Sequence, residues 1–140
     1  MSDFSITKTI FLNASRETVW AFLTEKEKLG HWFHPADADL AEGRDYALIS
    51  GKEGDEPVKQ CWGTVLEMQP PSRLRYSFTV KPLKGAMTDV VWTLESVPGG
   101  TKLTLVHSGL EVAGEGAFML SSALDVGWDK HLGALRDAMK

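Results

Sequence analysis

Cysteine is almost missing from this chain, since Cys61 is the single one among 140 residues. One cysteine excludes an internal disulfide and any metal site built from several thiolates. The sequence also has no basic run, and its formal net charge is −4. It therefore lacks the cationic surface by which proteins bind nucleic acid or an anionic membrane. We expect neither as a partner.

Long apolar runs are missing too, and none approaches the roughly 20 residues that span a bilayer. The opening MSDFSITKTI has no basic segment followed by an apolar one, so no signal peptide is expected and a cytoplasmic location is predicted. A nucleophile elbow, a P-loop and a dinucleotide fingerprint are likewise absent from the sequence. We therefore predict no cofactor and assign no catalytic residue. The length predicts one domain, residues 1–140.

The first third of the chain predicts a strand and two short helices. Apolar residues alternate over 4–12, which is typical of a strand with one buried side. Ser15 is a good N-cap for a helix over 16–23. Thr24 and Glu27 have the spacing of a capping box, which predicts a second short helix ending at Gly30. Pro35 then makes residues 31–40 a connector.

From residue 45 the apolar period changes to two. Strands are predicted over 46–50, 58–68, 74–80, 88–97 and 101–108, with the glycine-rich loop 51–57 closing a hairpin. One face of these strands is apolar and the other polar, as in an antiparallel sheet wetted on one side. The sheet must bury its apolar face against another element.

The last third predicts a flexible glycine-rich loop over 109–117 and a long helix over about 117–139. At 100° per residue the helix has one apolar stripe, made of Leu120, Leu124, Trp128, His131, Leu132, Leu135, Ala138 and Met139. It is the only predicted helix long enough to cover the sheet. The predicted fold is therefore α+β, with a curved antiparallel sheet of six or seven strands around a C-terminal helix.

Four segments in order carry a family resemblance: ASRETVWAFLTEKEKLGHWF (14–33), GTVLEMQPPSRLRYSF (63–78), GGTKLTLVHSGL (99–110) and GWDKHLGAL (127–135). With these, the chain resembles the START-like (SRPBCC, birch-pollen-allergen-like) superfamily. Within it, the chain is similar to the family named for the activator of heat-shock-protein-90 ATPase, in its single-domain bacterial form. The resemblance implies a helix-grip fold around a cavity that often receives hydrophobic molecules. It implies no single reaction, because the superfamily includes carriers and cyclases.

The long helix carries Gly127 at the edge of its buried stripe, where a missing side chain leaves space or admits a strand closely. A dry void of roughly 300 Å³ would cost about 7 kcal/mol, so a pocket here is expected to be small or to hold water or a ligand. The alternative is a filled core in which Trp128 packs and His131 is a satisfied core histidine. The predicted ligand-binding residues are Tyr76, Phe78, Trp92, Leu94, Leu105, His107, Leu124, Gly127, Trp128 and His131.

The connector offers two weaker hypotheses. Imidazole and carboxylate groups at His31, His34, Asp37 and Asp39 are metal-ligand types, but Pro35 breaks the helix that would align them, so a solvated loop and no metal are predicted. Trp32 and Phe33 either plug one end of the core or gate a pocket.

The leading functional hypothesis is binding of a hydrophobic or aromatic small molecule by a monomer or weak homodimer. A cyclase- or hydrolase-type enzyme that uses His131 with Tyr76 is the alternative. The family name raises a third hypothesis, a chaperone-interacting protein.

Overall fold

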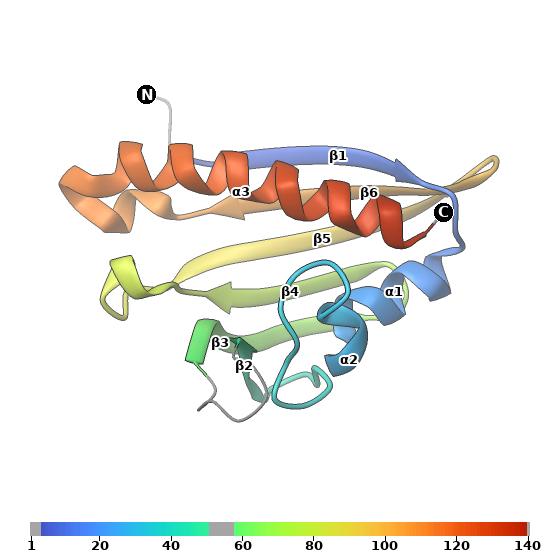
Figure 1. Cartoon of the computed structure of the whole chain (residues 1–140), viewed down its shortest axis with the longest axis horizontal. Coiled ribbons are helices and arrows are strands. Elements are labelled where there is room, and N and C mark those ends of the chain that lie inside the picture. Colours follow the sequence, from blue (N-terminus) through green and yellow to red (C-terminus); the bar gives the residue numbers. More distant parts are fainter. Residues whose placement is uncertain (1–3, 51–57, 140) are drawn as a thin grey trace.

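A computed structural model describes residues 4–50 and 58–139 of the chain (Figure 1). Six antiparallel strands form one sheet in the order β1-β6-β5-β4-β3-β2. The strands are β1 (Ile6–Leu12), β2 (Asp45–Ser50), β3 (Val58–Gln69), β4 (Arg73–Phe78), β5 (Thr88–Val97) and β6 (Gly100–Ser108). The predicted meander is confirmed, and the hairpin loop 51–57 lies outside the described residues.

Helices follow the first strand and the last. They are α1 (Arg16–Thr24), α2 (Lys26–Leu29) and α3 (Ala117–Ala138), with 3-10 helices η1 (Lys81–Leu83) and η2 (Leu110–Gly116). The α+β helix-grip fold predicted from the sequence is confirmed. Among the described residues, no helix combines the length and apolarity needed to cross a membrane.

Period-two burial selects the face of the sheet that meets the helices. In β5 and β6, Val90, Trp92 and Leu94 are buried opposite His107, Leu105 and Leu103, their register partners. In β4, Leu74, Tyr76 and Phe78 are buried on the same face. Alternate residues of a strand point to opposite faces, so these apolar side chains form one continuous floor.

The helices cover this floor in two parts (Figure 1). α3 lies along β1 and β6, and Lys8 of β1 forms ion pairs with Asp125 and Asp129 of α3, the second at 3.0 Å. α1 contacts β5 and β6, and the connector after α2 lies beside β2, to which it is joined by the bridge between Ala36 and Leu48. The Trp32 indole N–H donates to the Phe22 carbonyl oxygen at 2.8 Å, which ties the connector to α1. The two coverings meet along a seam above β3 and β4.

Local details differ from the sequence prediction at three places. The Thr24 hydroxyl donates to the Trp20 carbonyl oxygen instead of forming a capping box, and Asp39 caps α2 by accepting from the Lys26 N–H at 2.8 Å. The predicted flexible loop over 109–117 is the 3-10 helix η2, and its Leu110 is fully buried. Ala138, assigned to the buried stripe, is exposed at the end of α3.

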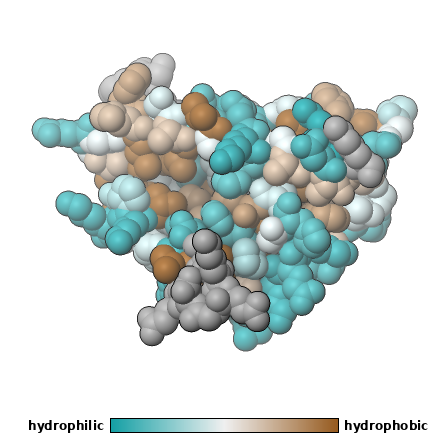
Figure 2. Space-filling view, viewed as in Figure 1, coloured by the Kyte–Doolittle hydropathy of each residue, from teal (hydrophilic) through white to brown (hydrophobic). Residues whose placement is uncertain are grey.

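The outer side of the molecule retains apolar side chains around the start of α3. Phe118, Met119 and Val126 are 73%, 78% and 66% exposed, and Val112 of η2 is 50% exposed. Figure 2 shows hydrophobic residues gathered at its upper left, over this part of the fold. Scattered exposed apolar residues are normal for proteins, but a contiguous group marks a contact surface.

Candidate functional site

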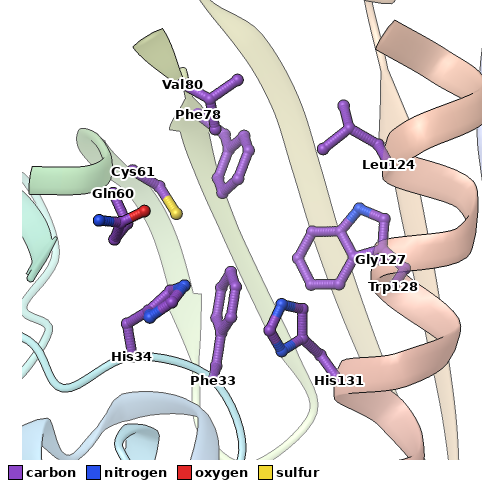
Figure 3. Close-up of a pocket in the computed structure, with 10 residues that line it drawn as sticks. All are labelled: Phe33, His34, Gln60, Cys61, Phe78, Val80, Leu124, Gly127, Trp128 and His131. Atoms are coloured by element: carbon purple, nitrogen blue, oxygen red, sulfur yellow. The ribbon is translucent and has the colours of Figure 1, made fainter. Parts of the chain in front are cut away.

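A cavity of about 150 Å³ lies at the seam between α3 and the β3–β4 part of the sheet. Figure 3 shows side chains converging on it from four segments. Its lining residues are Phe33 and His34 of the connector, Gln60 and Cys61 of β3, Phe78 of β4, Val80 after β4, and Leu124, Gly127, Trp128 and His131 of α3.

Aromatic rings form the walls of this cavity. The Phe33 ring centroid lies 5.3 Å from that of Trp128 and 4.5 Å from that of His131. Phe78 lies 6.0 Å from Trp128. Inclined rings at such distances make favourable edge and face contacts, so the walls pack on one another around the space.

Gly127 leaves one side of the cavity open. A Cβ atom built at this position would meet no atom within 4 Å apart from those of its chain neighbours and of its own turn of helix. Of the two interpretations of this glycine, close approach of a strand is wrong, because nothing lies near it. The missing side chain leaves space between α3 and the sheet.

A buried hydrogen-bond chain holds Trp128 in place. The Trp128 indole N–H donates to Nδ1 of His107 at 3.0 Å, and Nε2 of His107 lies 2.8 Å from the Thr88 hydroxyl. That hydroxyl donates to the Phe78 carbonyl oxygen at 2.7 Å, so the Nε2–H of His107 is the donor to Thr88. With His107 neutral, every polar atom in this row of hydrogen bonds has a partner. Burial lowers the pKa of His107 to about 4.

Two further histidines lie at the cavity itself. The ring centroids of His34 and His131 lie 5.7 Å apart, and the two rings are in an edge-to-face arrangement. Burial lowers the pKa of both imidazoles, and a charge on His131 would lower the pKa of His34 further. The Nδ1 atom of His131 lies 3.2 Å from the Trp32 carbonyl oxygen. At neutral pH both rings are therefore neutral hydrogen-bonding groups.

Cys61 adds a thiol to the lining but no nucleophile. It is 3% exposed, and burial raises its pKa to about 12. The reactive form of cysteine is the thiolate, which is scarce at neutral pH with such a pKa. Cys61 contributes a small, polarisable wall.

Half of the residues predicted to bind a ligand line this cavity: Phe78, Leu124, Gly127, Trp128 and His131. The others lie in the core outside its lining: Tyr76, Trp92, Leu94, Leu105 and His107. The Tyr76 hydroxyl accepts from the Trp92 indole N–H at 2.9 Å, and His107 acts behind Trp128. Their direct contact with a ligand stays a prediction.

Half of the lining residues were not predicted from the sequence. The missed residues are Phe33, His34, Gln60, Cys61 and Val80. Phe33 was considered as a plug or gate, and Pro35 marked the connector, which is the only sequence signal for this wall. Cys61 follows an irregularity of β3: Leu48 pairs with Cys61 but Ile49 with Lys59, which makes Gln60 a bulge residue.

The connector residues with metal-ligand side chains have other roles. Asp39 caps α2, and Asp37 accepts from the Ala47 N–H at 3.2 Å. His31 is exposed, while His34 is at the cavity. Over residues 4–50 and 58–139, no group of three or more histidine, cysteine, aspartate or glutamate side chains is placed to hold a metal ion.

Comparison with solved structures supports this architecture. CalU16 from Micromonospora echinospora matches with a TM-score of 0.73 and 27% identity over 94% of this chain and 73% of that one. DynU16, a putative protein in the dynemicin biosynthetic locus, matches at 0.76 and 22% identity over 97% of this chain and 47% of that one. The Aha1 dimer from Colwellia psychrerythraea matches at 0.74 and 20% identity over 96% and 95%. No curated protein matches the chain in sequence.

An open six-stranded antiparallel sheet gripping a long C-terminal helix, with a cavity between them, defines this chain as a helix-grip protein. The family model described as "Activator of Hsp90 ATPase homolog 1-like protein" matches residues 13–140. The chain belongs to that family, which confirms the resemblance drawn from the sequence.

Proposed function

We propose that this protein binds a hydrophobic or aromatic small molecule, in the cytoplasm, in the cavity between α3 and the sheet. The observation that carries this proposal is the aromatic wall of Phe33, Phe78 and Trp128 around a space that Gly127 leaves open. Small-molecule sites are concave and mostly apolar, with a few placed polar groups. Here His34 and His131 are such polar groups.

The size of the cavity limits its guest. An engineered cavity of about 150 Å³ in another protein stays dry and binds benzene, and the cavity here has about the same volume. A single aromatic ring is therefore the largest rigid group that fits without movement of α3 or the connector. A longer ligand would have to extend past the lining residues toward solvent.

The comparisons support the proposal at the level of class. Members of this fold class enclose small molecules between sheet and helix, as the resemblance implies. One matched structure is described as a putative protein in the dynemicin biosynthetic locus. The proposal itself rests on the cavity and its aromatic walls.

The test begins with native mass spectrometry of freshly purified protein, to detect a molecule that co-purifies. Toluene is then titrated while amide chemical shifts and tryptophan fluorescence are recorded. We expect saturable shifts around Trp128 and Phe78. The variant Gly127→Leu fills the cavity and should abolish them, while Gly133→Leu, also at an open position of α3, should leave them intact. A protein in which neither toluene nor phenol produces a saturable shift would contradict the proposal.

A cyclase- or hydrolase-type enzyme using the same cavity is the second candidate. It is favoured by the half-buried imidazole of His131, which is neutral and hence able to accept a proton. This function predicts that His131→Ala abolishes turnover while binding changes by less than about tenfold, or 1.4 kcal/mol. A parallel loss of both would indicate a packing role for His131.

We also propose that the chain forms a weak homodimer through the apolar residues Phe118, Met119 and Val126 of α3. A matched structure of similar fold is described as a dimer. Sedimentation velocity over a concentration series should show reversible association, and Met119→Lys should shift it toward monomer. Sedimentation that is independent of concentration would contradict a dimer.

A further inference from the structure

The hydrogen bonding of His131 fixes which of its ring nitrogens carries the proton. Nδ1 lies 3.2 Å from the Trp32 carbonyl oxygen. A carbonyl oxygen only accepts, so Nδ1 must be the donor. A neutral imidazole carries one N–H, and burial favours the neutral form of this ring. Nε2 is therefore an unprotonated acceptor.

Nε2 lies on the cavity side of the ring. In Figure 3 the His131 ring stands between Phe33 and Trp128, and the nitrogen farther from its own backbone lies toward Phe78. The neighbouring rings are Phe33 at 4.5 Å, Trp128 at 6.4 Å and the imidazole of His34 at 5.7 Å between ring centroids. The Trp128 N–H points away to His107. Nε2 is thus a hydrogen-bond acceptor set in an apolar wall.

An acceptor in such a wall selects its guest by chemistry. A ligand with a hydroxyl hydrogen can donate to Nε2, whereas an apolar ligand of the same shape leaves the nitrogen desolvated and unpaired. Sites built to hydrogen-bond a hydroxyl reject analogues that lack it, because a buried polar group without a partner is costly.

We propose that the ligand of this cavity is a phenol: a single aromatic ring whose hydroxyl donates to Nε2 of His131 while the ring packs against Phe33, Phe78 and Trp128. This inference rests on the proposed function, since it names the chemical class that the cavity binds. The volume of about 150 Å³ accommodates one ring. The hydroxyl adds one polar group, matched by one acceptor.

The experiment compares phenol with toluene, which has the same shape but no donor. Dissociation constants are measured by NMR titration at pH 7.5, where a histidine with an ordinary or lowered pKa is neutral. A net hydrogen bond of this kind contributes roughly 0.5–1.5 kcal/mol. We expect His131→Leu to lower the preference for phenol over toluene by about two- to twelvefold. His31→Leu, which alters an exposed histidine outside the lining, should leave the preference unchanged.

A measurement on the unaltered protein covers the case in which His131→Leu does not fold. The ¹⁵N resonance of His131 Nε2 should shift on saturation with phenol and not with toluene, because only phenol donates to this atom. The phenol inference would be overturned if the preference for phenol over toluene were the same in the unaltered protein and in His131→Leu. It would also be overturned if the Nε2 resonance did not shift on addition of phenol. Either result would leave the proposed function standing. Failure of both ligands to bind the unaltered protein would overturn both.

Discussion

The Trp128 indole donates its N–H to Nδ1 of His107 across 3.0 Å, and this bond joins the cavity wall to the sheet. His107 can accept it only while Nδ1 is unprotonated. The imidazole is fully buried, with a pKa of about 4 in the folded protein, against about 6.5 in an unfolded chain. Folding is therefore coupled to the proton on one core histidine.

This coupling predicts a loss of stability in acid. The folded pKa lies below the unfolded one, so the contribution of His107 is full above pH 6.5 and is lost as the pH falls toward 4. The difference of about 2.5 pH units corresponds to about 3 kcal/mol of unfolding free energy. Urea unfolding at several pH values should show this decline. The decline should be smaller in His107→Gln and unchanged in His31→Gln; equal slopes in all three proteins would refute the assignment.

Gly63 and Gly127 both lie in segments that carry the family resemblance, but substitution by alanine should affect stability in opposite directions at the two positions. A Cβ at Gly63 of β3 would lie 2.0 Å from the Ser77 carbonyl oxygen, so Gly63→Ala must push β3 and β4 apart. We expect it to destabilise the fold by more than 2 kcal/mol, since overpacking costs about 1–3 kcal/mol and the shifted backbone also carries ladder hydrogen bonds.

At Gly127 there is space, and alanine favours a helix interior by about 1 kcal/mol over glycine. Gly127→Ala should therefore stabilise the protein, as should Gly133→Ala, while only Gly127→Ala should weaken ligand binding. Thermal unfolding measures the three stabilities. A stable Gly63→Ala protein, or a destabilised Gly127→Ala protein, would contradict the described packing.

The sequence predicted the scaffold well because its signal is periodic. Leu103, Leu105 and His107 alternate along one strand, and Leu124, Trp128 and Leu135 recur along one helix, so their shared faces follow from geometry. These periods located the sheet, the long helix and the α3 side of the cavity. They could not show that Trp92 would be covered by Trp32 of the connector and by Trp128, at 5.9 and 5.6 Å between ring centroids, and so lie outside the lining.

The other side of the cavity depends on features without a period. Phe33 and His34 reach it through the path of a connector, which is fixed by bonds such as Ile49 N–H to the Pro35 carbonyl oxygen at 2.8 Å. Gln60 and Cys61 reach it at a bulge, where the pairing of β2 and β3 shifts by one residue. Bulges redirect side chains near functional sites, and nothing in the local sequence fixes their position.

The rate at which the Cys61 thiol is alkylated tests whether this side chain is buried in the folded protein. With a pKa of about 12, its thiolate fraction at pH 8 is about one part in ten thousand. Alkylation by iodoacetamide should therefore be slow in the folded protein and rapid in urea. Intact-mass measurements over time give both rates. Alkylation of the folded protein as fast as that of an unfolded chain would show that Cys61 is not buried as described.

The facing pair of His34 and His131 predicts that ligand binding weakens in acid. The titratable groups at the cavity are these two imidazoles and the Cys61 thiol, and the charge of Lys130 also disfavours protonation of His131. A neutral ligand removes water from both rings, so it binds best when both are uncharged. As the pH falls below 6.5 and protons bind, the dissociation constant should rise. Toluene titrations at pH 8 and pH 5 measure this change.

A variant separates this effect from acid unfolding. His34→Asn keeps a polar side chain at the cavity but removes one of the two imidazoles that titrate there. Its dissociation constant should depend less steeply on pH than that of the unaltered protein, while the acid decline of unfolding free energy due to His107 persists. If His34→Asn changes the pH dependence of the dissociation constant and that of the unfolding free energy together, the loss of binding in acid comes from unfolding. The histidine pair would then not set the pH dependence of ligand affinity.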